Sequence, residues 1–215
     1  MHLTTLLPLA LLTAAATTSP ISPRDDTYTI TTAQLLTIAP ASNTCANAPA
    51  PDQCATAAQA APLISASFQR YGVTSRAEQA AVVGLMAFES AQFRYNRNVD
   101  PGVPGQGTRN MQSPTFNARY AAALNLNTTG KDPAAVLDLI LASPENDFGS
   151  GAWFLTAVCP ADVRAALQTG SEDGWTRFVT GCVGTQVTEE RRAFWGRAVL
   201  ALGVQQQQAV TRGMC

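Results

Sequence analysis

Apolar residues recur at helical spacing through most of the chain, and no stretch of useful length alternates apolar and polar residues as a strand would. Two predicted helices have recognisable starts, because Pro follows Ser113 and Asp132. Ser and Asp are typical N-cap residues, and Pro is favoured at the first position of a helix. We therefore expect a mainly α fold. The predicted helices span residues 32–39, 62–71, 76–91, 114–124, 133–142, 153–158, 161–168, 172–180 and 189–202.

The predicted helix 76–91 differs from the others because its run AAVVGLMAF is apolar on every side. Ser75 and Glu78 form a capping box at its start. A helix that is apolar all round is typically buried, so we expect this one in the middle of the domain. Glu89 lies near its end, where burial would raise the pKa of a carboxyl group that has no partner. Glu89 is therefore the candidate acid of the chain.

A Gly- and Pro-rich segment, residues 96–113, follows the central helix and is expected to be a loop or small hairpin. Its amides can bond hydroxyl and amide groups of a ligand, and its glycines allow a ligand to approach the backbone closely. An ordinary irregular surface loop has the same composition, so that alternative stays open. The candidate side chains in this segment are Asn96, Asn98, Asp100, Gln106, Arg109, Asn110 and Gln112.

Composition narrows the possible functions. The 215 residues, 46% of them hydrophobic and 13% charged, are typical of one globular domain. A net charge of -1, with Lys131 as the single lysine, offers no basic field, so we do not expect a nucleic-acid partner. His2 is the single histidine and lies in a segment expected to be removed. We therefore expect no histidine chemistry, no metal site and no cofactor, which leaves acid–base work to carboxylates.

The apolar run 3–16 has the length of a signal-peptide core and is too short to cross a bilayer, although a buried N-terminal helix is the alternative. We expect a secreted, extracellular monomer with no membrane association. Its expected parts are a signal peptide over 1–18, a flexible lead-in with a short helix over 19–44, the main domain over 45–203 and a polar tail over 204–215.

Secretion favours disulfide formation, and proximity in the sequence favours pairing Cys45 with Cys54 and Cys159 with Cys182. Other pairings stay open, and Cys215 is left over. Asn127 begins an Asn-Thr-Thr acceptor for N-glycosylation, as expected of a surface loop in a secreted protein.

Three short motifs resemble the lysozyme-like superfamily, in particular family 19 chitinases and goose-type lysozymes. They are Ala87-Phe88-Glu89-Ser90 at the end of the buried helix, the segment 105–112, and Arg191-Arg192 before Phe194-Trp195. The resemblance covers roughly residues 76–203. It implies a lysozyme-like helical domain with a buried central helix and a small loop lobe.

The same resemblance implies a secreted glycoside hydrolase that cleaves β-1,4-linked N-acetylhexosamine polymers, with peptidoglycan as the preferred polysaccharide and chitin second. Glu89 would protonate the leaving oxygen, and Asp100 would position a water molecule. The substrate would be bound by Asn96, Asn98, Gln106, Arg109, Asn110 and Gln112.

The sequence also departs from that pattern. Phe88 stands where those chitinases usually have a histidine, and no second glutamate follows in the loop. Asp100 could instead simply begin a turn, because the sequence Asp100-Pro101-Gly102 is typical of one. Two alternatives therefore remain. The chain could be a non-catalytic secreted glycan-binding protein or effector, or a structural protein in which Glu89 is paired with an arginine. The candidate arginines are Arg94, Arg97, Arg109, Arg191 and Arg192.

Overall fold

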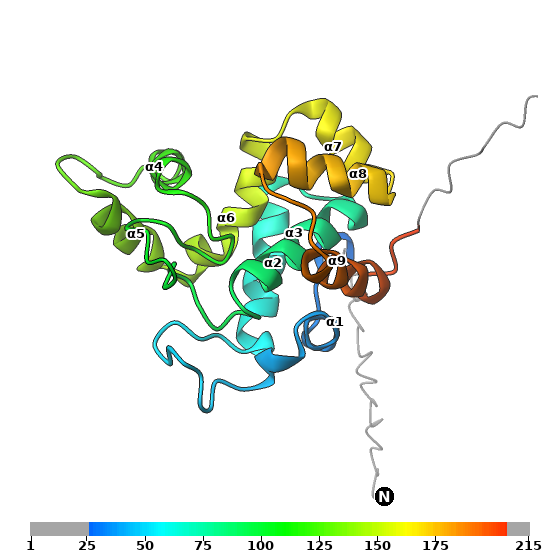
Figure 1. Ribbon diagram of the computed structural model, residues 1–215, viewed down its shortest axis with the longest axis horizontal. Helices are drawn as coiled ribbons and strands as arrows, with labels where there is room; N and C mark the ends of the chain where they lie inside the picture. The colour runs from blue at the N-terminus through cyan, green and yellow to red at the C-terminus, as the bar shows by residue number, and fades with distance from the viewer. Residues whose placement is uncertain (1–25, 206–215) are drawn as a thin grey trace, which may run out of the picture.

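The computed structural model describes residues 26–205, and within them the prediction of a mainly α fold is confirmed (Figure 1). These residues contain no extended β-strand, and isolated bridges join Gly107 to Arg97 and Gln112. The expected signal peptide, Cys215 and tail residues 206–215 lie outside the described residues. The helices are α1 (Thr32–Ile38), α2 (Ala57–Tyr71), α3 (Arg76–Glu89), α4 (Pro114–Ala123), α5 (Pro133–Leu141), α6 (Pro144–Ala157), α7 (Ala161–Gln168), α8 (Glu172–Arg177) and α9 (Glu189–Ala201), with a π-helical turn at Phe178–Val183.

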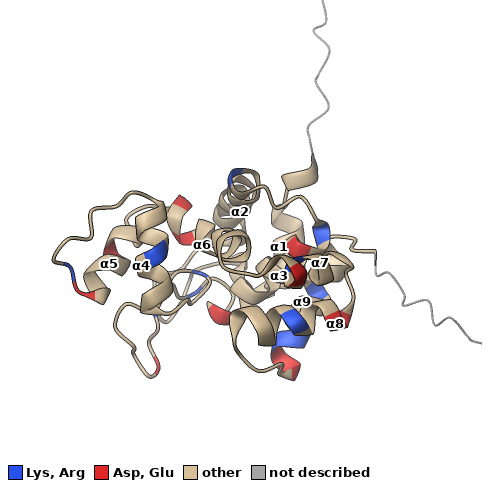
Figure 2. Ribbon diagram, turned by 90° about the horizontal axis from the view of Figure 1, so that it is seen from above, with Lys and Arg blue, Asp and Glu red and all other residues tan. Residues whose placement is uncertain are grey.

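Helix α3 is the central element, as its uniformly apolar sequence predicts. Every residue from Ala77 to Ala87 is buried, and the helix packs against α6, α7 and α9. Helices α4 and α5 pack together to one side of it (Figure 1). In Figure 2, charged segments of both signs are scattered among the helices. None of the helices within residues 26–205 has both the length and the apolar character needed to cross a membrane.

Two glycines allow α3 to pack closely. A Cβ atom built on Gly84 would lie 3.0 Å from the Cα of Trp195 in α9. On the opposite partner, a Cβ on Gly151 of α6 would lie 2.8 Å from the sulfur of Met86. Small residues at these two positions therefore set the spacing of three helices, and the spacing of α3 and α9 in turn positions the candidate site.

Helix α6 is longer than the sequence predicts: it begins at Pro144 rather than near residue 153. Ser143 caps it by accepting a hydrogen bond from the Asn146 amide at 3.3 Å. Gly149 lies inside the helix, where a Cβ would come within 2.8 Å of the Tyr120 hydroxyl. Gly149 therefore allows close packing inside a helix.

The described part of the expected lead-in, residues 26–44, is packed against the domain. Leu35 and Ile38 of α1 are fully buried, and α1 packs against α2 and α9. The side-chain amide of Gln34 donates to the Ala201 carbonyl at 3.1 Å. A seven-residue helix carries too few apolar positions for the sequence pattern to show this packing.

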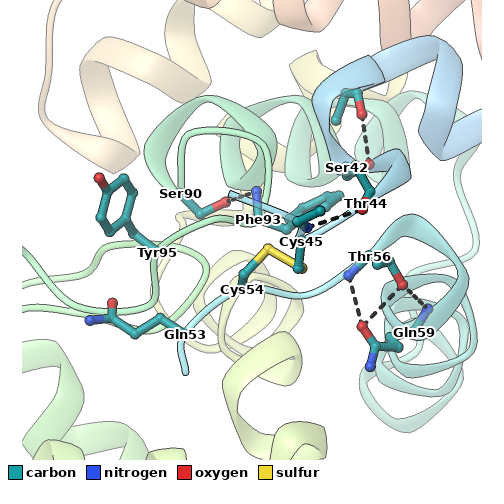
Figure 3. Close-up of a disulfide and its surroundings, with 12 residues drawn as sticks. Ser42, Thr44, Cys45, Gln53, Cys54, Thr56, Gln59, Ser90, Phe93 and Tyr95 are labelled. Atoms are coloured by element: carbon teal, nitrogen blue, oxygen red, sulfur yellow. Dashed lines mark hydrogen bonds between the residues drawn. A yellow bond between two sulfur atoms is a disulfide. The ribbon is translucent and has the colours of Figure 1, made fainter. Parts of the chain in front are cut away.

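The two disulfides of the structure are those expected, Cys45–Cys54 and Cys159–Cys182. The first closes a loop that lies beside the turn after α3 (Figure 3). The second joins the end of α6 to the π-helical turn.

Replacing Gly84 by Ala tests the packing of α3 against α9. The added methyl group would meet the backbone of α9, so we expect a loss of about 1–3 kcal/mol in the free energy of unfolding. Gly196→Ala is the matched control, because it lies inside α9 and its Cβ would have nothing within 4 Å. Both variants gain the same helix propensity. Chemical denaturation that shows equal stability for the two would contradict the proposed packing.

Candidate functional site

Glu89 is the last residue of α3, and its side chain is 20% exposed. It lines a cavity of about 240 Å³, here called the Glu89 cleft, and an adjoining side cavity of about 220 Å³. Glu89 and Met111 line both cavities, so the two cavities adjoin at these residues. The other residues of the Glu89 cleft are Gln106, Asn110, Gln112, Ser113, Phe116, Phe154, Val183, Thr185 and Arg191. Those of the side cavity are Tyr95, Arg97, Asn98, Val99 and Asp100.

Arg191 of α9 is the partner of Glu89. Its Nε and Nη2 atoms lie 3.3 and 3.1 Å from the same carboxylate oxygen, Oε1. The guanidinium also donates from Nη1 to the Gln186 carbonyl at 3.1 Å and lies 4.6 Å above the Phe88 ring. Within the described residues, no hydrogen bond reaches Oε2 of Glu89. One carboxylate oxygen is therefore held and the other is available to a ligand.

The pKa of Glu89 is raised above its ordinary value of 4.5. Burial is the larger cause, because it disfavours the charged carboxylate. The hydrogen bond and the positive charge of Arg191 act in the opposite direction. The expectation of a carboxyl group with a raised pKa beside a cavity agrees with this geometry.

A left-handed turn directly follows Glu89 and sets the direction of the chain. Ala91, Gln92 and Phe93 have φ angles of 49°, 63° and 66°, a conformation that costs non-glycine residues about 1–3 kcal/mol each. Ser90 stabilises the turn. Its hydroxyl donates to the Met86 carbonyl at 2.6 Å and accepts from the Phe93 amide at 2.9 Å. Phe93 is fully buried against Phe148, which also offsets the strain.

The first disulfide loop supports the same turn from outside (Figure 3). The amide of Ala55 donates to the Phe93 carbonyl at 2.9 Å. The side-chain oxygen of Gln53 accepts from the amides of Asn96 and Arg97 at 3.1 and 3.2 Å. The loop 45–54 thus fixes the backbone that leads from Glu89 into the candidate loop.

Arg109 and Asp147 form an ion pair that is 4% exposed on both sides, with Nε 2.9 Å from Oδ2. Burial raises the pKa of Asp147, and the adjacent Arg109 opposes the rise. The guanidinium also donates to the carbonyls of Phe93 at 2.7 Å and Gln53 at 2.6 Å. Asn96 donates to the Asp147 carboxylate at 3.2 Å. This pair therefore connects α6 to the turn, the candidate loop and the disulfide loop.

Two side-chain amide groups, those of Asn117 and Gln112, fix the wall of the Glu89 cleft. The buried Nδ2 of Asn117 donates to the carbonyls of Gly105 at 2.8 Å and Gln112 at 3.2 Å. Its Oδ1 must then be the acceptor, and it receives a bond from Nε2 of Gln112 at 2.8 Å. This leaves Oε1 of Gln112 with no partner among the described residues.

The predicted site residues separate into three groups. Glu89, Gln106, Asn110 and Gln112 meet in the Glu89 cleft, while Asn98 and Asp100 meet Glu89 in the side cavity. Asn96 and Arg109 instead line a third cavity beside Asp147, where their polar groups bond the protein itself. Asn127 is exposed, as expected of a surface loop. Glycosylation there stays a prediction.

Sequence reasoning missed the apolar wall of the cleft. Phe116, Phe154 and Val183 come from α4, α6 and the π-helical turn, and no local pattern brings them together. Arg191 was one of several candidate partners of Glu89, and the structure selects it.

Within residues 26–205, no group of three His, Cys, Asp or Glu side chains is arranged to hold a metal ion.

Comparison with known proteins gives one informative similarity. No family model matches the chain, and no solved structure matches it. A protein of Fusarium oxysporum (strain Fo5176), described as a bifunctional dioxygenase–epoxy alcohol synthase, is 41% identical over 158 residues. The match covers 68% of this chain and 12% of that protein. The chain therefore corresponds to a small part of that relative.

This similarity corrects the assignment made from the resemblance to lysozymes and chitinases. The relative is described by oxygenase and epoxy alcohol synthase activities, so the expectation of a glycoside hydrolase, with its glycan-binding alternative, is wrong. The motifs behind it were short, and the structure gives one of them another physical reason. Arg109, in the segment 105–112, holds the loop in place by donating to the Phe93 carbonyl.

The raised pKa of Glu89 predicts a pH-dependent contribution to stability. Above pH 4.5 the folded chain binds more protons than the unfolded chain, because the carboxyl group of Glu89 stays protonated longer in the folded state. The stabilising contribution is therefore complete below pH 4.5 and is lost as pH rises through the raised pKa. Glu89→Gln removes it. We expect the unfolding free energy of the wild type, minus that of the variant, to fall as pH rises above 4.5 in urea titrations.

Glu145→Gln is the control for that measurement. Glu145 is exposed, and the hydrogen bond from Ser143 lowers its pKa, so its contribution changes below 4.5 and in the opposite direction. If the unfolding free energy of the wild type minus that of Glu89→Gln instead rises above pH 4.5, pairing with Arg191 outweighs burial in setting the pKa of Glu89.

Arg109→Met tests the buried ion pair. The substitution leaves the Asp147 carboxylate buried and unpaired, so we expect a loss of about 3–5 kcal/mol in the free energy of unfolding. Adding Asp147→Leu should recover part of that loss. Arg97→Met is the control, because its pair with Asp138 is exposed and should contribute less than about 1 kcal/mol. Equal losses for the two arginine variants in guanidinium titrations would contradict the structural role assigned to the buried pair.

Proposed function

We propose that the Glu89 cleft binds an oxygenated acyl compound, a molecule with an apolar chain that carries hydroxyl or epoxide groups. The observation that carries the proposal is the mixed lining of one cavity. Polar groups from Glu89, Gln106 and Gln112 share it with the rings of Phe116 and Phe154. Small-molecule sites typically combine an apolar wall with a few polar groups that fix orientation.

Apolar side chains line both cavities and could contact the apolar part of the ligand. Phe116 and Phe154 pack edge to face with ring centroids 4.9 Å apart. Met111 lines both cavities, and Val99, which is 56% exposed, lines the side cavity. An acyl chain laid along Met111 would cover this surface. Each methylene group buried there would contribute about 0.8 kcal/mol to the free energy of binding. The polar groups near Glu89 would then face the oxygenated part of the chain.

The relative from Fusarium supports the ligand class, since its description includes an epoxy alcohol synthase. The matched region is 12% of that protein, so we take only the ligand class from it. The proposal assigns binding to this chain. It assigns no oxidation step to this chain.

Calorimetric titration with an 18-carbon epoxy alcohol tests the proposal, and we expect saturable binding with one ligand per chain. Met111→Asp should weaken it about tenfold or more, because a second carboxylate replaces an apolar side chain beside Glu89. The matched control is Leu200→Asp, which changes a residue of α9 that is 80% exposed and does not line the cleft. No binding by the wild type, or equal weakening by both variants, would refute the proposal.

A further inference from the structure

The free oxygen of Glu89 has a defined chemical character. Arg191 directs two N–H groups at Oε1, which leaves Oε2 as the oxygen open to a ligand. An ionised carboxylate only accepts hydrogen bonds. Three nitrogen atoms of Arg191 already have partners in Glu89 and Gln186, so at this point the cleft presents mainly an acceptor.

A second acceptor without a partner among the described residues lies in the same cavity wall. Asn117 bonds two carbonyl oxygens through Nδ2, and this determines the orientation of its own amide and of the Gln112 amide. Oε1 of Gln112 is the atom that remains. This oxygen is itself buried, so Oε2 of Glu89 is the acceptor that a ligand meets first.

We propose that the cleft selects ligands that bring an O–H donor to Glu89, and so binds an alcohol in preference to the corresponding ketone. This inference rests on the proposed function, because it specifies which oxygenated acyl compound the same cleft prefers. The two ligands differ by one hydrogen-bond donor and have almost the same shape, so discrimination reports hydrogen bonding at this point.

The first test compares two ligands on the wild-type chain: an 18-carbon epoxy alcohol and the epoxy ketone with the same chain. We expect the alcohol to bind at least about tenfold more tightly, since a ketone leaves the carboxylate oxygen without a donor. Equal affinities would overturn the inference and leave the proposed function standing. Failure of both ligands to bind would overturn both. This comparison requires no variant, so it does not depend on whether a substituted chain folds.

The second test uses Glu89→Gln. Arg191 should keep the amide oxygen in the position of Oε1, which turns the NH₂ group toward the cleft as a donor. We therefore expect the preference to invert, with the ketone binding more tightly than the alcohol. If Glu89 had only a structural role, Glu89→Gln would weaken the binding of both ligands equally. Glu145→Gln, which removes an exposed carboxylate outside the cleft, should keep the preference of the wild type. Retention of the alcohol preference by Glu89→Gln would overturn the inference.

Discussion

The contact between α3 and α9 is the constraint on which the candidate site depends. Gly84 allows the two helices to approach to backbone contact, and that approach places Arg191 within hydrogen-bond distance of Glu89. The pair is partly exposed, with 16% and 20% of the two side chains accessible, so it contributes only modest stability. Its more important effect is directional, because it holds one carboxylate oxygen and leaves the other free.

The surrounding structure keeps that carboxylate in place at some cost. Three consecutive residues after α3 adopt the left-handed conformation, which is unfavourable without compensation. Ser90, the buried Phe93 ring and the Arg109–Asp147 pair together supply the compensating contacts. Strain of this kind often occurs at functional sites. Here it ends the helix directly after Glu89, whose side chain lines two cavities.

Much of the fold could be predicted from the sequence. The uniformly apolar run 80–88 identified the central helix, and the Ser-Pro and Asp-Pro pairs located the starts of α4 and α5. Glu89, Gln106, Asn110 and Gln112, four of the candidate residues, line one cavity, while their roles stay predictions. The start of α6 could not be predicted, because Gly149 resembles a turn residue until Tyr120 is seen packed against it. The role of Arg109 depended on Asp147, which is 38 positions away in the sequence.

The assignment to lysozyme-like enzymes failed for a related reason. A carboxylate at a helix end next to a glycine- and amide-rich loop is a general way to build a polar cavity, and it does not specify the ligand. The similarity to the Fusarium protein is what separates the alternatives. The apolar half of the cleft, on which the proposed ligand class rests, is not visible in the sequence. It comes from Phe116, Phe154 and Val183, which lie on three separate elements and have no shared sequence pattern.

The most direct test of the role proposed for Glu89 is an NMR measurement of its side-chain carboxyl carbon in chain labelled with ¹³C-glutamate. The signal would be followed as pH is varied, first without ligand and then with the epoxy alcohol bound. A half-buried carboxyl group that binds the alcohol should titrate with a midpoint above the ordinary value of 4.5, and its carbon should change chemical shift clearly when the alcohol binds. A midpoint at or below 4.5, with a chemical shift that the alcohol does not change, would contradict that role.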